Sequence, residues 1–161
     1  MTKTLLNIAF SLLLSASVWA QNIDTQKLDT LCQAIAHAEG FGKKRAIPTR
    51  YHNPGDLKSR RGITPLAGQR KIGKAGHIVF YNDEAGWEAL REYITKIVDG
   101  QSRHYTTYAT LAQVSHVYAQ RWQPWLRQVT KQLGVSGSTR ITDFLKPDYY
   151  VDDAEGHCYT M

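Results

Sequence analysis

The chain has 161 residues, with 20 Lys and Arg against 14 Asp and Glu, so its formal net charge is +6. This length fits one ordinary domain better than two. The positive charge indicates an anionic partner, but no motif of a nucleic-acid-binding fold is present, so nucleic acid is not expected.

The first twenty residues have the pattern of a secretory signal peptide. Lys3 gives a positive start, residues 5–14 are largely apolar, and residues 17–20 offer a cleavage site of small residues. We therefore expect residues 1–20 to be removed and residues 21–161 to form a single exported domain, periplasmic or secreted. An uncleaved membrane anchor is the alternative, although the apolar run is short for a spanning helix.

Apolar residues spaced three and four apart predict a first helix over residues 25–39, with Asp24 or Thr25 as its cap. A run of β-favouring residues predicts a short strand over 77–81, and the glycine-rich segment 62–76 before it is expected to be flexible or to form a hairpin. Further helices are predicted over 84–98, 110–119, from near Pro124 to Leu133, and over 138–145, followed by an irregular tail over 146–161. The expected fold is mainly α, of the α+β kind, with a small β-hairpin.

One carboxylate lies on the apolar face of the first predicted helix. The spacing that joins the apolar residues continues onto Glu39, and Gly40 then ends the helix. Loss of water and the negative end of the helix dipole both favour the protonated form of Glu39. This combination suits a general acid. The alternative is an ordinary helix end whose side chain reaches solvent.

A tight turn follows in the stretch Arg50 to Leu57, which has the sequence RYHNPGDL. Pro54 keeps Asn53 out of the helical region, and Pro-Gly is a strong turn signal. Asp56 is expected to hydrogen-bond nearby backbone within this turn. Its alternative role is that of a second carboxylate in a site with Glu39.

These residues resemble the lysozyme-like lytic transglycosylase and muramidase superfamily, particularly its short phage and secreted members. The resemblance rests on Glu39-Gly40 and on Asn53 to Leu57, with further matches at FYNDEAGWEAL in 80–90, at Tyr118-Ala119 and at 133–135. It implies a lysozyme-like helical domain that cleaves the β-1,4 bond between N-acetylmuramic acid and N-acetylglucosamine without a cofactor. Glu39 would act as acid and then base, because the substrate's N-acetyl group and 6-hydroxyl replace a second carboxylate.

The resemblance also implies substrate-binding residues. Asn53 would help to position the acetamido group, and Tyr118 would line the cleft beside Glu39, although a tyrosine on an apolar stripe is also typical of a core. Asp56 and Tyr51 complete the expected set. Aromatic residues that could offer faces for sugar rings are Tyr51, Tyr81, Trp87, Trp122 and Trp125. Trp87 lies on the apolar stripe of its predicted helix, so a core position is favoured for it. Trp122 and Trp125 flank Pro124 at a helix start, where partial exposure is expected.

Two other functions remain open at this point: a hydrolytic muramidase, and a non-catalytic lysozyme-like module that binds the wall. The expected partner is the peptidoglycan glycan strand, and the protein is expected to be a monomer. A secretion apparatus, or an immunity or inhibitor protein, is a further candidate partner. The basic cluster from Lys43 to Lys74 either attracts wall polymers or membrane headgroups, or consists of solvated loop charges.

Cys32 and Cys158 are the two cysteines, and an even count in an exported domain predicts one disulfide between them. A catalytic thiol is the alternative, but no histidine arrangement near either cysteine favours it. The six histidines form no ligand pair at helical spacing, so no metal is expected.

Overall fold

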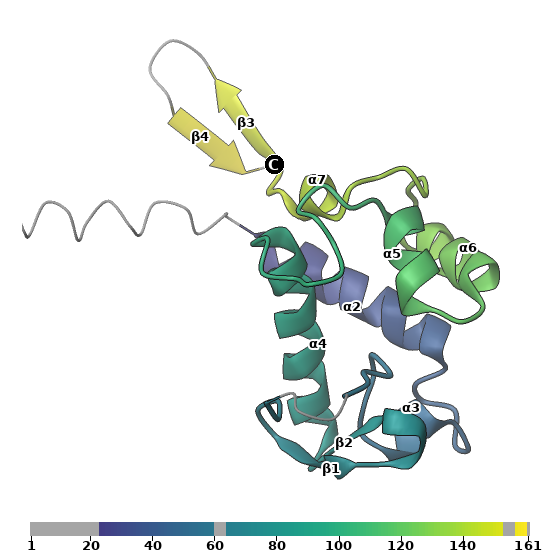
Figure 1. Cartoon of the computed structure of the whole chain (residues 1–161). Helices are drawn as coiled ribbons and strands as arrows, with labels where there is room; N and C mark the ends of the chain where they lie inside the picture. The colour runs from purple at the N-terminus through teal and green to yellow at the C-terminus, as the bar shows by residue number, and fades with distance from the viewer. Residues whose placement is uncertain (1–22, 60–63, 153–156, 161) are drawn as a thin grey trace, which may run out of the picture.

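The computed structural model describes residues 23–59, 64–152 and 157–160. It is mainly helical with a small β-hairpin, which confirms the predicted fold class. Figure 1 shows the hairpin at the lower end of the molecule, with most of the helices above it. The signal peptide predicted over 1–20 lies outside the described residues, and none of the helices in the described ranges is long and apolar enough to cross a membrane.

The first helix of the described structure is α2 (Thr25–Glu39), and its bounds are those predicted from the sequence. The Asp24 carboxylate caps it by accepting hydrogen bonds from the backbone N–H groups of Gln26 and Lys27 at 2.9 and 3.0 Å. Gly40 ends it in the left-handed conformation, with φ of 83°. The helix packs against three others, α4, α6 and α7, so its apolar face lies at the centre of the core.

Four further helices surround α2: α4 (Asp83–Val98), α5 (Leu111–Tyr118), α6 (Trp122–Leu133) and α7 (Ile141–Leu145). All four were predicted, and α7 begins three residues later than expected. Thr110 opens α5 with a capping box that includes Gln113. The most deeply buried side chains of this core include Leu31, Ile35, Leu90, Ile94, Ile97, Leu111, Val114 and Ile141.

The predicted hairpin is present. Strand β1 (Gln69–Ile72) pairs antiparallel with β2 (Ile78–Phe80), and the short 3-10 helix η2 (Lys74–Gly76) connects them. A short helix that was not predicted, α3 (Ile47–Arg50), begins at a proline-containing first turn. We refer to residues 40–59 and 64–81, which contain α3, β1 and β2, as the small lobe.

The small lobe joins the helices through a close contact on the first turn of α4. A Cβ added at Gly86 would lie 2.0 Å from the carbonyl oxygen of His52 and 2.7 Å from Cδ of Pro54. The loop that contains both residues therefore lies directly on α4, and only glycine permits this approach.

The prediction of an irregular tail was wrong. Strand β3 (Tyr149–Asp152) pairs antiparallel with β4 (His157–Thr160), with Val151 opposite Cys158. Tyr and Val favour strands, and this signal in the stretch Tyr149 to Val151 was overlooked. The side chain of Cys158 lies outside the described structure, so its disulfide with Cys32 stays a prediction.

Candidate active site

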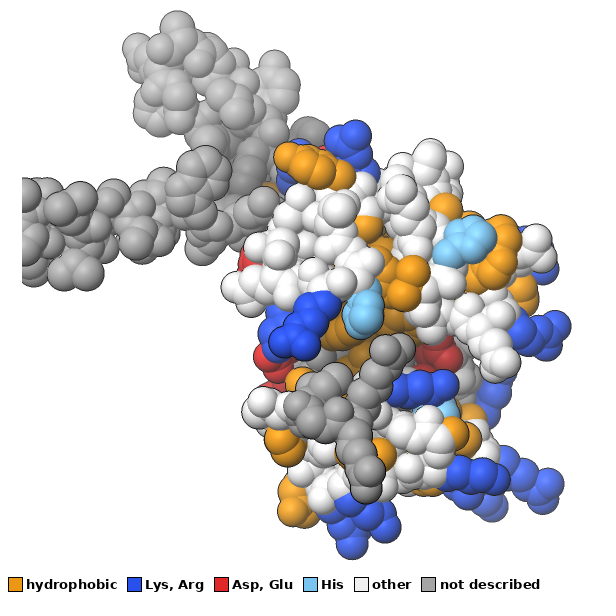
Figure 2. All heavy atoms as spheres, viewed as in Figure 1, with side chains coloured by type: hydrophobic (Ala, Val, Ile, Leu, Met, Phe, Trp, Pro, Cys, Tyr) orange, Lys and Arg blue, Asp and Glu red, His pale blue; other side chains and the backbone are white. Residues whose placement is uncertain are grey.

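A cavity of about 760 Å³ lies between the small lobe and the helices. Figure 2 shows this face hollowed, with an apolar wall and with acidic and basic side chains close to one another at its edge. The cavity is lined from α2, α4, α5, α6 and the small lobe. Its polar and aromatic lining includes Glu39, Asp56, Lys58, His77, Tyr93, His104, Tyr105, Tyr118, Arg121 and Trp125.

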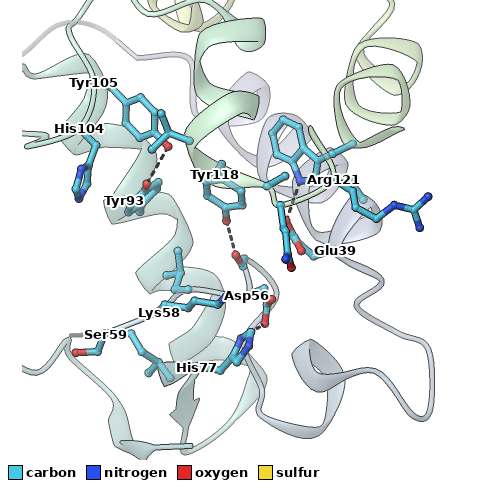
Figure 3. Close-up of a pocket in the computed structure, with 18 of the residues that line it drawn as sticks. Glu39, Asp56, Lys58, Ser59, His77, Tyr93, His104, Tyr105, Tyr118 and Arg121 are labelled. Carbon is cyan, nitrogen blue, oxygen red and sulfur yellow. Dashed lines mark hydrogen bonds and ion pairs between the residues drawn. The ribbon is translucent and has the colours of Figure 1, made fainter. Parts of the chain in front are cut away.

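Glu39 lines this cavity from the last residue of α2. The indole Nε1–H of Trp125 donates a hydrogen bond of 2.8 Å to Glu39 Oε1 (Figure 3). The pKa of Glu39 is raised from its ordinary value of 4.5 to about 7. Burial is the largest cause and the negative charge of Asp56 adds to it, whereas the Trp125 hydrogen bond and the charge of Lys58 oppose the rise. Glu39 therefore carries a proton in a large fraction of molecules at neutral pH.

Trp125, the hydrogen-bond partner of Glu39, was expected from the sequence only to stack against sugar rings. It is 5 % exposed on the face of α6 that packs against α2, and its ring lies 5.4 Å from that of Tyr118. The hydrogen bond joins residues 86 positions apart. The place of Trp125 beside Pro124 at a helix start predicted partial exposure, which is wrong, and no signal in the sequence connected its N–H to Glu39.

Asn53 has an internal role. It is fully buried, its Nδ2 donates to the carbonyl oxygens of Leu57 and Ile78 at 2.9 Å each, and its Oδ1 accepts from the Leu57 N–H at 2.8 Å. Both amide hydrogens are thus used, and Asn53 is not among the residues that line the cavity. It ties the turn to β2, rather than offering its amide to a substrate as the resemblance implied.

The turn packs tightly against the helices at Gly55. A Cβ added there would lie 2.8 Å from Cδ1 of Leu90 and 3.0 Å from the hydroxyl of Tyr118. That hydroxyl donates a hydrogen bond to the Gly55 carbonyl (Figure 3). Tyr118 therefore lines the same cavity as Glu39, as the resemblance implied, and also fixes the position of the turn.

Asp56 faces the same cavity as Glu39, and its carboxylate contacts a histidine instead of nearby backbone, which corrects the role expected within the turn. Its Oδ1 lies 2.7 Å from Nδ1 of His77, which is 7 % exposed and directly precedes β2. Burial raises the pKa of Asp56, and the charge and hydrogen bond of His77 act against this rise. The backbone of Asp56 is left-handed, with φ of 46°, which aspartate tolerates better than most residues.

His77 is a site residue that sequence reasoning missed. It begins the predicted strand over 77–81, but nothing in the sequence linked it to a carboxylate 21 positions earlier. Its backbone forms a bridge with Lys58, so the strand end and the turn are held together by main chain as well as side chain. The pair of Asp56 and His77 therefore forms one unit that faces Glu39 across the cavity (Figure 3).

Several expected binding residues lie outside the cavity. Tyr51 packs under η2: a Cβ at Gly73 would lie 2.5 Å from its ring, and its hydroxyl accepts from the Lys74 N–H at 3.5 Å. Trp87 packs edge-on against Phe41, with ring centroids 5.4 Å apart. Two further aromatic residues named as stacking candidates do not line the cavity: Tyr81 is 68 % exposed, and Trp122 lies 3.8 Å from the ring of His116.

An aromatic wall forms the side of the cavity near α4. The hydroxyl of Tyr93 donates to that of Tyr105 at 3.5 Å, and the ring of Tyr93 contacts that of Tyr118 edge-on at 5.8 Å. These rings offer apolar faces next to the acidic groups, an arrangement that suits a sugar ring with its apolar face and polar rim. Within the described ranges, no group of three His, Cys, Asp or Glu residues is placed to hold a metal ion.

Cys32 is buried in the core, and burial raises the pKa of its thiol to about 12. The thiolate, which is the nucleophilic form, is thus strongly disfavoured at neutral pH. Comparison of the chain with models of known families, with curated proteins and with solved structures found no match.

Proposed function

We propose that this protein is an enzyme that cleaves peptidoglycan at the β-1,4 bond between N-acetylmuramic acid and N-acetylglucosamine, with Glu39 as the general acid. The observation that carries the proposal is the environment of Glu39, which is held by Trp125 in an open cavity with a pKa of about 7. A donor is most effective when its pKa lies near the working pH, and such proton transfer contributes about 10²–10⁴-fold to a rate.

The first step places the proton of Glu39 on the glycosidic oxygen as the bond to the anomeric carbon breaks. In a lytic transglycosylase, the ionised Glu39 then removes the proton of the substrate's 6-hydroxyl, whose oxygen attacks the anomeric carbon. The product is a 1,6-anhydro ring, and Glu39 ends the cycle protonated. Trp125 supports both steps because its N–H donates to the carboxylate and holds its orientation.

A hydrolytic muramidase is the second candidate, and the position of Asp56 favours it. Asp56 lines the same cavity as Glu39, and its charge raises the pKa of Glu39. A carboxylate across from the acid is the group that activates water or stabilises the cationic transition state in hydrolytic glycosidases. His77 would keep Asp56 ionised and oriented for that role. In this alternative, water replaces the 6-hydroxyl and the product has a reducing end.

Export to the periplasm or medium, by the predicted signal peptide, belongs to the same proposal because peptidoglycan lies outside the cytoplasm. If the enzyme opens the wall of its own cell, a secretion apparatus would be a partner. If it attacks the wall of another cell, an immunity or inhibitor protein would be a partner. A wall-binding module without turnover is the outcome that would replace the proposal if Glu39 proves inert.

The test is mass spectrometry of soluble products after the purified mature protein is incubated with peptidoglycan sacculi. Products one water lighter than hydrolytic muropeptides are expected from the transglycosylase, and full-mass products with reducing ends from the muramidase. Glu39→Gln should release neither. The matched control is Glu92→Gln, which makes the same change on an exposed residue paired with Lys96 and should keep full activity. Release by Glu39→Gln, or none by the wild type, would overturn the proposal.

A further inference from the structure

The charges of this chain are strongly segregated. Ten of the 20 Lys and Arg residues lie between positions 40 and 81, where Asp56 is the one acidic residue. The rest of the chain holds the other ten basic residues against thirteen acidic ones, so it is net negative. The stretch 40–81 spans the small lobe, so positive charge is concentrated on one end of the fold.

The basic side chains of the small lobe are exposed. Eight are in the described ranges, and one of them, Lys58, lines the cavity. The other seven lie outside the cavity lining: Lys43, Lys44, Arg45, Arg50, Arg70, Lys71 and Lys74. None of the six ion pairs found in those ranges uses any of the seven; the Lys and Arg pairs are all made by residues of the helical part. Figure 2 shows blue side chains projecting from the lower end of the molecule, below the hollow. We call these seven residues the basic surface.

Unneutralised like charges on one lobe repel one another, and an ordinary surface intersperses both signs. The basic surface therefore fits an anionic partner that supplies the missing charge. It lies next to the cavity, because the hairpin that carries Arg70, Lys71 and Lys74 also supplies His77 and Ile78 to the cavity lining.

We propose that the basic surface docks the carboxylate-bearing wall polymer as it runs out of the cavity, so that the protein holds a long anionic strand at two places. This inference rests on the proposed function for the identity of the polymer. The docking would raise the local concentration of substrate and make association fall with salt, since charges on an exposed surface are screened over about 10 Å at 0.1 M.

Two other anionic partners fit the surface less well. A bilayer surface requires apolar side chains among the cations, and Ile72, 50 % exposed, is the one large exposed hydrophobic residue on the hairpin strand of the basic surface. Single-stranded nucleic acid requires exposed aromatic platforms. Tyr81, 68 % exposed, is the one aromatic residue of the described small lobe that is widely exposed, and one ring does not make a stacking platform. The ring of Tyr51 is occupied by the guanidinium of Arg50 at 5.8 Å and by the backbone of Gly73.

The experiment measures pelleting of the catalytically blocked Glu39→Gln protein with sacculi across a salt series. The test variant adds Arg70→Gln, Lys71→Gln and Lys74→Gln in that background. Exposed charge pairs each contribute little to binding, so loss of the three charges should weaken binding of the test variant by roughly tenfold at low salt. Its salt dependence should become shallower, because fewer charges contribute.

The matched control makes the same charge change on the helical part, with Arg103→Gln, Arg127→Gln and Lys131→Gln. These side chains are exposed, and no ion pair of the described residues uses them. The control should bind within about twofold of the parent, since its charges lie away from the basic surface. Sacculi whose carboxyl groups have been amidated, and neutral chitin, should bind weakly to the parent protein at every salt concentration.

Equal weakening of the test and control variants would overturn the proposal, because net charge alone would then explain binding. Tighter binding to phosphatidylglycerol vesicles or to DNA than to sacculi would overturn it in favour of that partner. The product assay separates this proposal from the proposed function. Cleavage by the wild type with unchanged binding of the test variant would refute docking alone, whereas selective loss of binding without cleavage by the wild type would refute the enzyme alone.

Discussion

Replacing Glu39 by Gln should stabilise the folded protein at alkaline pH while it removes catalysis. A carboxyl group whose pKa is raised by folding binds its proton more tightly in the folded state than in the unfolded state. The wild type therefore loses stability as the pH rises from about 4.5 to about 7, the ordinary and folded-state pKa values of Glu39. Gln has no proton to lose, so it escapes this penalty.

The expected size follows from the same two values. One pKa unit corresponds to about 1.36 kcal/mol, so the rise from 4.5 to about 7 corresponds to about 3 kcal/mol at pH 8. At pH 4 the carboxyl group is largely protonated in both states, and the two proteins should differ little. The amide oxygen of Gln can still accept the hydrogen bond from Trp125, so the indole N–H keeps its partner.

The assay is urea unfolding followed by tryptophan fluorescence at pH 4 and pH 8. The control Glu92→Gln changes an exposed residue and should alter the free energy of unfolding by less than about 1 kcal/mol at either pH. The raised pKa assigned to Glu39 would be refuted by either of two results. The Glu39→Gln protein could be no more stable than the wild type at pH 8, or its free energy of unfolding could increase equally at both pH values.

Three further substitutions test the site. Trp125→Phe removes the hydrogen bond that lowers the pKa of Glu39, so the pH at which activity falls as Glu39 deprotonates should rise in a pH profile of kcat/KM. An unmoved profile would contradict the role of this bond. His77→Gln removes the histidine charge that lowers the pKa of Asp56. In a hydrolytic mechanism, the pH at which activity rises as Asp56 ionises should therefore move upward. If this pH does not change, Asp56 is excluded as the base. Gly55→Ala should cost about 1–3 kcal/mol in urea unfolding, because its methyl group would meet Leu90 and the Tyr118 hydroxyl; a neutral result would show that the turn has room to shift.

The sequence predicts the helices well because their signals are local. The ends of α2 follow from a capping aspartate and a left-handed glycine, and Glu39 was identified because the apolar spacing continues onto it. The short helix α3 has only four residues, too few for a periodic pattern. The first strand of the tail contains two Tyr residues and a Val, which favour strands, but a run of four residues is a weak signal by itself.

The partners of the catalytic candidate could not be predicted in the same way. The Trp125 bond to Glu39 and the His77 contact with Asp56 join residues 86 and 21 positions apart, and each depends on how elements pack.

Asn53 illustrates the opposite error, a residue that was identified correctly but given the wrong role. A Pro-Gly turn indicates an exposed polar loop, but its asparagine is fully buried and bonded to backbone. Local chemistry identifies such residues, whereas tertiary packing decides what they do.

The two acidic groups of the cavity belong to different parts of the fold. Glu39 stands on α2 within the helices, whereas Asp56 stands on the small lobe, which lies on α4 through the contact at Gly86. No single element therefore fixes the spacing between the two carboxyl groups. A side chain at position 86 would push the lobe outward and change that spacing without touching either acid. The spacing of the two carboxyl groups therefore depends on glycine at position 86 of α4, a residue that takes no part in the chemistry.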